Sequence, residues 1–176
     1  MTRAVFLDRD GVLNRAIITN GKPHPPATLA ALEIPDDVPS ALRALRDAGF
    51  LLIGITNQPD VARGTQTRAT VEKINAVLCA RLPLAEIRVC YHDDADDCEC
   101  RKPKPGLILQ ASAAHAIERA ASFMIGDRWK DIEAGKRAGC QTILIDHAYA
   151  ESWEGALPDA RAHSLGEAAA WILKER

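Results

Sequence analysis

The sequence has few aromatic side chains, no excess of either charge and no long apolar segment. Aromatic residues make up only 5% of the 176 residues, so we expect a core of aliphatic side chains and close helix contacts. Lysine and arginine number 22 against 24 aspartates and glutamates, a formal net charge of −2. This balance argues against a dedicated nucleic-acid binder. No uncharged apolar run approaches the roughly 20 residues that a membrane-spanning helix needs.

The beginning of the chain also lacks the pattern of a signal peptide, because Asp8 follows only a few apolar residues. The composition is 47% apolar and 26% charged, which is ordinary for a globular protein. We therefore expect one soluble, cytoplasmic domain over residues 1–176 that acts as a monomer. Its expected partners are small molecules, with no nucleic acid and no membrane.

Cysteine usage indicates a metal site rather than disulfides. The five cysteines stand at positions 79, 90, 98, 100 and 140, and three of them lie within eleven residues together with His92. A chain without a secretion signal seldom carries a disulfide framework, and such a cluster is typical of metal binding. We expect Cys79, in a helical pattern, and Cys140, before a strand, to be buried as small apolar side chains.

Short aliphatic runs alternate with helical patterns along the chain, as in a parallel sheet covered on both faces. The predicted strands are Ala4–Leu7, Leu51–Thr56, Ile87–Tyr91, Ser122–Ile125 and Thr142–Ile145. The predicted helices are Pro39–Ala48, Thr67–Leu82, Leu107–Arg119, Asp131–Ala138 and Ala168–Leu173. This alternation predicts an α/β fold, a doubly wound Rossmann-like parallel sheet with right-handed crossovers.

Two segments carry no such pattern. Residues Thr19–Pro39 hold five of the ten prolines, so we expect an ordered but irregular excursion that is too short to form a cap domain. We expect His24, within this excursion, to be a surface side chain without a catalytic role. The segment 146–163 is weakly patterned, and we assign it only to the surface.

Polar side chains follow the ends of the predicted strands. The first strand is followed by Asp8 and Asp10, and the next three are followed by Thr56, Asn57 and Gln58, by Cys90 and His92, and by Asp127 and Arg128. In doubly wound sheets, ligands bind in the crevice outside these strand ends. We therefore expect all of these groups to face one shared crevice.

The carboxylates of Asp8 and Asp10 raise each other's pKa unless a cation neutralises them. Mg²⁺ would do so, with Asp127 as a further hard oxygen ligand, and Gly11 lets the chain turn sharply away. The alternative is that each polar residue only caps a turn or a helix. Matched chemistry at four strand ends makes this the weaker interpretation.

Four segments resemble the four motifs of the haloacid dehalogenase superfamily of phosphohydrolases. They are Asp8–Asn14, Thr56–Gln58, Arg101–Gly106 and Gly126–Asp131. Within the superfamily, the chain is most similar to the small branch of the D-glycero-D-manno-heptose 1,7-bisphosphate phosphatases and the histidinol-phosphatase domain. The resemblance runs from about residue 3 to residue 146 with its order and spacing preserved. It implies the haloacid dehalogenase fold without a large cap domain.

The resemblance also implies a magnesium-dependent phosphomonoesterase that acts through an aspartyl-phosphate. Asp8 would be the nucleophile, and Asp10 would protonate the leaving oxygen and then activate water. Mg²⁺ would be held by the carboxylates of Asp8 and Asp127 and by the backbone carbonyl of Asp10. Asp131 would act on the metal through a water.

Further residues would hold the phosphoryl group. Thr56 would hydrogen-bond it, and Lys102 would neutralise the charge on nucleophile and phosphate, the kind of electrostatic preorganisation that dominates phosphoryl transfer. The substrate contacts that the resemblance implies are Asn57, Gln58, Arg101 and Arg128.

Cys90, His92, Cys98 and Cys100 offer three thiolates and one imidazole, a set typical of a closed, tetrahedral structural Zn²⁺ site. The alternative is a reduced, irregular loop with locally packed cysteines. A catalytic zinc is disfavoured because protein ligands fill all four positions. A zinc loop over 90–100, which the heptose branch also has, would present the following cations from a rigid element. We expect the acidic insert within it, residues 93–97, to be solvated.

Two departures from the branch fall at the expected mouth of the site. Residues 15–22 replace a polar Asp-x-Gly-Tyr-like segment, and Pro59–Asp60 stands where Ser-Gly is usual. We expect an open active-site mouth bordered by Arg101, Lys102 and Arg128. Such a mouth suits a substrate with an anionic distal part, such as D-glycero-D-manno-heptose 1,7-bisphosphate or a similar sugar phosphate. The alternative substrate is histidinol phosphate. A nucleic-acid 3′-phosphatase and a catalytically silent, zinc-stabilised binding module are disfavoured.

Overall fold

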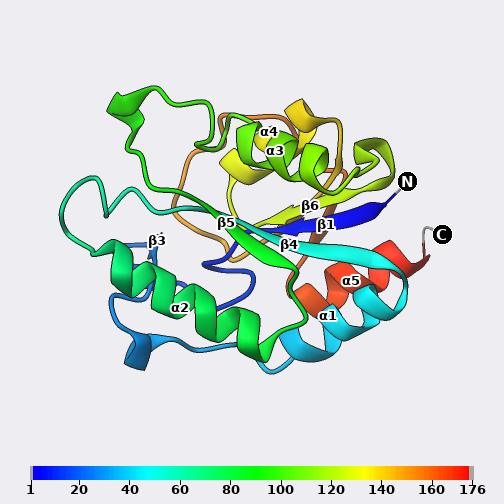
Figure 1. The fold of residues 1–176 in the computed structure, drawn as a ribbon, viewed down its shortest axis with the longest axis horizontal. Coiled ribbons are helices and arrows are strands. Elements are labelled where there is room, and N and C mark those ends of the chain that lie inside the picture. The colour runs from blue at the N-terminus through cyan, green and yellow to red at the C-terminus, as the bar shows by residue number, and fades with distance from the viewer. Residues whose placement is uncertain (1, 175–176) are drawn as a thin grey trace.

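The computed structural model describes residues 2–174 and contains one six-stranded sheet between two layers of helices (Figure 1). The strands of this sheet are β1 (Arg3–Leu7), β4 (Phe50–Asn57), β5 (Glu86–Cys90), β6 (Phe123–Gly126), β7 (Gln141–Ile145) and β8 (Ala160–Ala162). Their order is β5-β4-β1-β6-β7-β8, and all neighbouring pairs are parallel. The predicted parallel α/β fold is confirmed.

Two buried clusters cover the two faces of the sheet. One face carries α1 (Val38–Asp47), α2 (Arg68–Arg81) and α5 (Leu165–Lys174), and the other carries α3 (Gly106–Ala114) and α4 (Trp129–Ala138) (Figure 1). Strand β1 shows why its sequence is apolar throughout. Val5 and Leu7 belong to the first cluster and Ala4 and Phe6 to the second, because successive side chains of a strand point to opposite faces.

Some local predictions were wrong. Helix α3 ends at Ala114 rather than at Arg119, because Ala116 takes a left-handed conformation with φ of 50° and turns the chain. Cys79 is exposed on α2 instead of buried, whereas Cys140 is buried as expected. Within the segment 146–163, residues Ala160–Ala162 pair with β7 as a short edge strand.

The excursion after the first motif contains a hairpin that we did not predict. Strands β2 (Ile17–Thr19) and β3 (Lys22–His24) pair antiparallel. Asn20 and Gly21 connect them with φ values of 53° and 73°, and a two-residue turn with both φ values positive matches the twist of a hairpin. The rest of the excursion forms the short 3₁₀ turn Leu29–Ala31, irregular chain and, from Val38 on, the start of α1.

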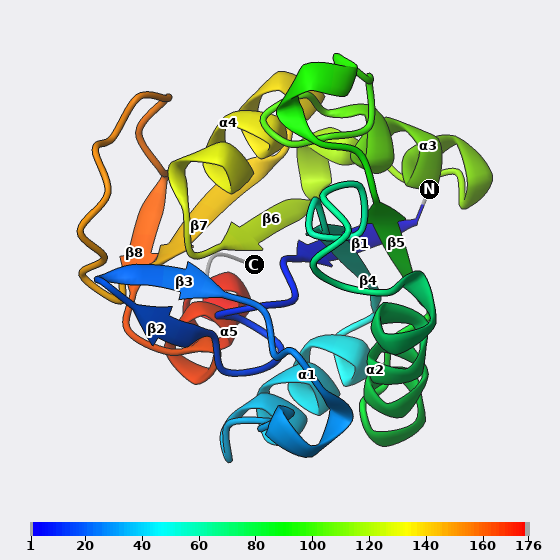
Figure 2. The same cartoon turned by 90° about the vertical axis from the view of Figure 1, so that its left-hand side faces the viewer.

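The sheet reverses its winding beside β1, since β4 and β5 lie to one side and β6, β7 and β8 to the other. The carboxyl ends of β1, β4 and β6 therefore meet at the switch point where ligands bind in such sheets. Figure 2 shows the β2–β3 hairpin beside the segment that follows β7, drawn in orange. None of the described helices has the length and apolar character needed to cross a membrane.

Candidate active site

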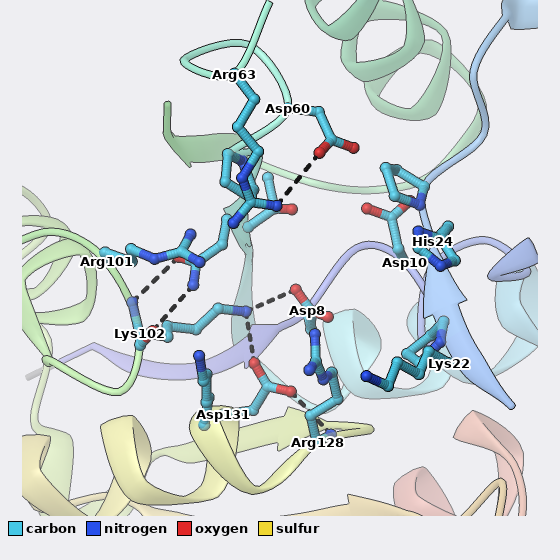
Figure 3. Close-up of a pocket in the computed structure, with 16 residues that line it drawn as sticks. Asp8, Asp10, Lys22, His24, Asp60, Arg63, Arg101, Lys102, Arg128 and Asp131 are labelled. Atoms are coloured by element: carbon cyan, nitrogen blue, oxygen red, sulfur yellow. Dashed lines mark hydrogen bonds and ion pairs between the residues drawn. The ribbon is translucent and has the colours of Figure 1, made fainter. Parts of the chain in front are cut away.

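A cavity of about 240 Å³ opens at the carboxyl ends of β1, β4 and β6 (Figure 3). Of the residues predicted from the sequence, it brings together Asp8, Asp10, Thr56, Asn57, Arg101, Lys102, Arg128 and Asp131. Asp127 and Gln58 do not line this cavity and are buried, with 5% and 1% exposure. Cys90 and His92 do not line the shared crevice that we expected, because they lie at the end of β5, the edge strand of the sheet.

Three carboxylates and one ammonium form the centre of the site. One oxygen of each of Asp8, Asp127 and Asp131 lies within 4.8 Å of the others. Asp8 directly follows β1, Asp127 directly follows β6, and Asp131 stands in the first turn of α4. Lys102 reaches in from the loop before α3, and its Nζ lies 2.6 Å from Asp8 Oδ1 and 2.6 Å from Asp131 Oδ1 (Figure 3). The Ile55 carbonyl accepts a further hydrogen bond from Nζ at 2.8 Å.

Burial dominates the electrostatics of this centre. It raises the pKa of Asp8 to about 6, against the lowering effect of Lys102. Burial, together with the neighbouring Asp8 and Asp131 carboxylates, raises the pKa of Asp127 well above its ordinary value. Burial alone would lower the pKa of Lys102, but Asp131 and Asp8 outweigh it and raise that pKa. Three carboxylates against one ammonium leave a negative charge that a divalent cation would compensate.

Asp127 also has the free ligand atom that a metal site requires. Its Oδ2 accepts a hydrogen bond from the Tyr149 hydroxyl at 2.8 Å. Its Oδ1 is buried and has no hydrogen-bond partner among residues 2–174, an uncommon state for a buried polar atom. Gly11 provides the space, since a Cβ at that position would come within 1.9 Å of Asp127 Oδ2. The hard oxygen donors of this cluster suit Mg²⁺.

Residues at the end of β4 hold the opposite wall. Gln58 donates to Thr56 Oγ1 at 2.9 Å and to Asp10 Oδ2 at 2.8 Å. The amide of Asn57 donates to the Lys102 carbonyl at 3.0 Å and accepts from the Lys102 N–H at 3.1 Å. Both side chains therefore hold neighbouring site residues in place, and the substrate contacts that we expected of them stay predictions.

Asp10 is held by donors that sequence reasoning did not assign. Arg9 is fully buried and reaches both Asp10 oxygens at 3.0–3.2 Å, and Asn14 donates to Asp10 Oδ1 at 3.0 Å. Arg9 also donates to Asn75 Oδ1 on α2 at 3.0 Å. The signal was the charge itself, because an arginine between two aspartates at a buried strand end requires a carboxylate partner.

The mouth of the cavity carries the expected cations together with several that we did not expect. The Arg101 guanidinium donates to Asp94 Oδ1 at 2.7 Å and to the His92 carbonyl at 3.3 Å. Arg128 pairs with Glu151. The hairpin and the loop after β4 add Lys22, His24 and Arg63 (Figure 3).

Three expectations about the mouth are thereby decided. Both segments that depart from the branch reach the cavity, the first only through Lys22 and the second through Pro59 and Asp60. His24 lines it as well, whereas we assigned it only to the surface. The acidic insert is not merely solvated, because Asp94 pairs with Arg101, and Asp93 pairs with Arg63 at 2.5 Å. The contact of Arg63 with Asp93 joins two separate loops, which sequence spacing does not reveal.

The cysteine and histidine side chains of the loop 90–100 converge as a second cluster. Cys100 Sγ lies 3.1 Å from Cys90 Sγ, 3.4 Å from Cys98 Sγ and 3.3 Å from His92 Nδ1. Cys90 Sγ lies 3.6 Å from both Cys98 Sγ and His92 Nδ1. Four soft donors at these separations surround a point that is suited to a tetrahedrally bound metal. We call these four residues the Cys–His cluster.

Comparison with known proteins shows the family. A family model described as HAD-hydrolase-like matches residues 99–168. The D-glycero-beta-D-manno-heptose-1,7-bisphosphate 7-phosphatase of Pasteurella multocida is 38% identical over 157 residues, which cover 82% of this chain and 82% of the relative. The D-glycero-alpha-D-manno-heptose-1,7-bisphosphate 7-phosphatase of Photorhabdus laumondii is 31% identical over 88% of this chain and 90% of the relative.

A solved structure gives the same result. The D,D-heptose 1,7-bisphosphate phosphatase from B. bronchiseptica, complexed with magnesium and phosphate, has a TM-score of 0.84 and 26% identity, covering 99% of this chain and 100% of that chain. Identity above 30% over most of both chains, a shared fold and four motifs gathered around one cavity agree. This chain belongs to the haloacid dehalogenase superfamily, in the branch of the heptose-1,7-bisphosphate 7-phosphatases, and it is a phosphatase.

Proposed function

We propose that the chain is a Mg²⁺-dependent phosphomonoesterase that forms an aspartyl-phosphate on Asp8 and acts on a sugar bisphosphate. The substrate that we favour is D-glycero-D-manno-heptose 1,7-bisphosphate. The observation that carries the proposal is the contact of Lys102 with both Asp8 and Asp131 at the floor of an open cavity, 2.6 Å to each. A carboxylate held this way at a strand end is oriented for attack and is neutralised at the same time.

The residues that would hold Mg²⁺ are Asp8, Asp127 and the backbone carbonyl of Asp10, with Asp131 close enough to act directly or through a water. The unpartnered Oδ1 of Asp127 and the clustered carboxylates support this set. The bound cation would supply charge stabilisation for the phosphoryl oxygens. Its presence with phosphate in the relative from B. bronchiseptica is consistent with this assignment.

In the first half-reaction, an Asp8 oxygen attacks phosphorus, and the bond from phosphorus to the ester oxygen breaks. The leaving oxygen takes a proton from Asp10. In the second half-reaction, Asp10 takes a proton from water as the water oxygen attacks phosphorus, and the bond between Asp8 and phosphorus breaks to release inorganic phosphate. Asp10 lines the cavity and its side chain is 15% exposed, so a bound substrate can reach it.

Thr56 and Lys102 support the transferred group. The Thr56 hydroxyl accepts a hydrogen bond from Gln58, which leaves its O–H to donate to a phosphoryl oxygen. The Lys102 ammonium lies where negative charge accumulates during the transfer. The Asn57 amide holds the Lys102 backbone at both its N–H and its carbonyl, so β4 positions this cation.

The charge of the mouth supports a second anionic group on the substrate. Arg63, Arg101, Arg128, Lys22 and Lys130 line the cavity outside the reaction centre. Neighbouring carboxylates hold the guanidinium groups of Arg101 and Arg128 in place, and paired guanidinium groups still have donors for phosphate oxygens. A distal phosphate therefore fits this mouth better than the neutral imidazole end of histidinol phosphate.

We further propose that the Cys–His cluster binds one structural Zn²⁺. The metal would fix the loop 90–100, whose Asp94 and His92 carbonyl hold the Arg101 side chain. Zinc would thus act on substrate binding through Arg101 rather than on the reacting phosphoryl group. The alternative is a reduced loop without metal, and elemental analysis of the purified protein distinguishes the two states.

Phosphate release from a panel of substrates tests the proposal. The panel contains both anomers of D-glycero-D-manno-heptose 1,7-bisphosphate, the corresponding monophosphates, histidinol phosphate and an aryl phosphate, each with Mg²⁺ and with a chelator. We expect activity only with Mg²⁺ and the highest kcat/KM for a bisphosphate. Equal or better turnover of histidinol phosphate would overturn the substrate assignment, and undiminished activity with the chelator would overturn the metal assignment.

A further inference from the structure

The segment 146–151, which directly follows β7, connects the separate loops of the site. We call it the β7 strap. Its contacts, in chain order, join His147 to Gly11, Tyr149 to Asp127, Ala150 to Gly21 and Glu151 to Arg128. The strap therefore touches the loop after β1, the loop after β6 and the turn of the β2–β3 hairpin. The segment has the position of a surface loop, but its side chains contact Asp127 of the carboxylate cluster and residues beside that cluster.

The contact of Tyr149 with Asp127 is the one that reaches a metal ligand. The phenolic hydroxyl donates to Asp127 Oδ2 at 2.8 Å, while Oδ1 is buried without a hydrogen-bond partner among residues 2–174. We propose that Tyr149 is a positioning residue of the metal site, which fixes the Asp127 carboxylate so that Oδ1 is presented to the divalent cation. The proposal rests on the Mg²⁺ site of the proposed function.

The surroundings of Asp127 explain why such a partner is needed. Asp127 Oδ2 occupies the space that a Cβ on Gly11 would fill, and the terminal torsion of an aspartate has broad minima. A carboxylate with one oxygen unpaired can therefore rotate away from a ligand geometry unless its other oxygen is held. The Tyr149 hydroxyl stands 3.1 Å from that same position beside Gly11, where its hydrogen bond holds Oδ2.

Hydrogen bonds and an ion pair hold the β7 strap in place, so the position of Tyr149 is defined. Asp146 Oδ1 accepts from the Ala148 N–H at 3.0 Å, and Asp146 Oδ2 pairs with Arg161 of β8 at 2.9 Å. Ala148 takes the left-handed conformation with φ of 55°, which turns the chain between His147 and Tyr149. A non-glycine residue in this conformation persists where its surroundings hold it. His147 then donates to the Gly11 carbonyl at 2.7 Å.

The test is Tyr149→Phe, which removes the hydroxyl and keeps the ring. Binding of Mg²⁺ alone is measured by isothermal titration calorimetry on the full chain without substrate. Residues that hydrogen-bond to a metal ligand contribute about 10–100-fold to metal affinity or activity. We therefore expect Tyr149→Phe to bind Mg²⁺ about tenfold more weakly. The Mg²⁺ concentration for half-maximal hydrolysis should rise in parallel, while Tm and zinc content stay unchanged.

The matched control is Tyr91→Phe, the same chemical change at the other tyrosine of the chain, which stacks on Arg68 of α2. It should leave Mg²⁺ affinity at the wild-type value. Tyr149→Ala, which also removes the ring, should weaken Mg²⁺ binding about as much as Tyr149→Phe does. A loss confined to the alanine variant would assign a packing role and overturn the proposal, as would unchanged Mg²⁺ affinity in Tyr149→Phe. A wild-type protein that binds no Mg²⁺ would instead overturn the proposed function.

Discussion

The two clusters that flank Lys102 differ in how the fold assembles them. The carboxylates of Asp8, Asp127 and Asp131 come from separate elements, and all three side chains are buried, with residue exposures of 8%, 5% and 3%. The Cys–His cluster comes from eleven consecutive residues, and among its members only Cys90 is fully buried. The first cluster exists only after the sheet has formed, whereas the second can form within one loop.

This difference predicts different consequences for the two proposed metals. The carboxylate cluster is preorganised by Lys102 and the strand ends, so a cation bound there would contribute to the chemistry rather than to the stability of the fold. The Cys–His cluster has a complete set of four protein donors, so a metal bound there would contribute local stability. Substitutions in the first cluster should therefore change turnover, and substitutions in the second should change Tm.

The largest effect is expected for Asp8→Asn. The amide has nearly the same shape but is a poor nucleophile, so kcat should fall on the order of 10³-fold or more while Tm shifts by only a few degrees. Steady-state hydrolysis and thermal denaturation measure both quantities. Asp47→Asn, an exposed carboxylate on α1, is the control and should leave both unchanged. Near wild-type turnover in Asp8→Asn would falsify the covalent mechanism.

The opposite pattern is expected for Cys98→Ser. Removing one thiolate should release the zinc and lower Tm by about 5–10 °C, the shift that about 2–3 kcal/mol produces in a domain of this size. Elemental analysis and thermal denaturation measure the two effects. Cys79→Ser is the matched control, because Cys79 is exposed on α2 outside the cluster. Wild-type protein purified without chelators and free of zinc would rule out this assignment.

A smaller effect, on KM, should connect the loop of the Cys–His cluster with the active-site cavity through Arg101. Arg101→Ala should raise KM for the bisphosphate about tenfold and lower kcat less, because in the proposed function Arg101 would contact the distal part of the substrate. Asp94→Asn removes the ion pair that holds the guanidinium and should change KM in the same direction by a smaller factor. Arg137→Ala, an exposed α4 residue paired with Glu133, is the control. A loss in kcat alone would place Arg101 at the reacting group instead.

The sequence predicted five strands of the sheet, the polar residues at the ends of β1, β4 and β6, and both clusters, because each leaves a local signal. Buried parallel strands are apolar runs, and parallel topology brings their carboxyl ends together whatever lies between them. The Cys–His spacing is likewise local. These features depend on residue type and order, which a single sequence records.

The hairpin and the β7 strap were missed for two different reasons. The hairpin had a signal, Asn20-Gly21 between two short strands, but the prolines around it were given more weight. The strap has no periodicity, and the role of Tyr149 depends on where Asp127 lies in the folded protein. Contacts between distant loops, such as Arg63 with Asp93, have no counterpart in sequence spacing.

The smallest expected effect is on Tm and concerns Asp159. Donors of the protein itself compensate the charge of this carboxylate, in contrast to that of Asp8. Asp159 accepts hydrogen bonds from the Thr142 N–H at 2.7 Å and from Lys136 at 2.6 Å. Burial raises the pKa of Asp159, but these donors outweigh it and lower that pKa below the ordinary value of 3.8.

A lowered pKa means that the stabilisation is complete above pH 3.8 and is lost as the pH falls through the lower folded value. Asp159→Asn should therefore lower Tm at pH 7, and its difference from wild type should shrink as the pH falls below 3.8. The side chain is 36% exposed, so solvent screening keeps the effect small. Glu154→Gln, exposed in the same loop, is the control and should show no such dependence. A difference that grows on acidification would show that Asp159 requires neutralisation, as the carboxylate cluster does.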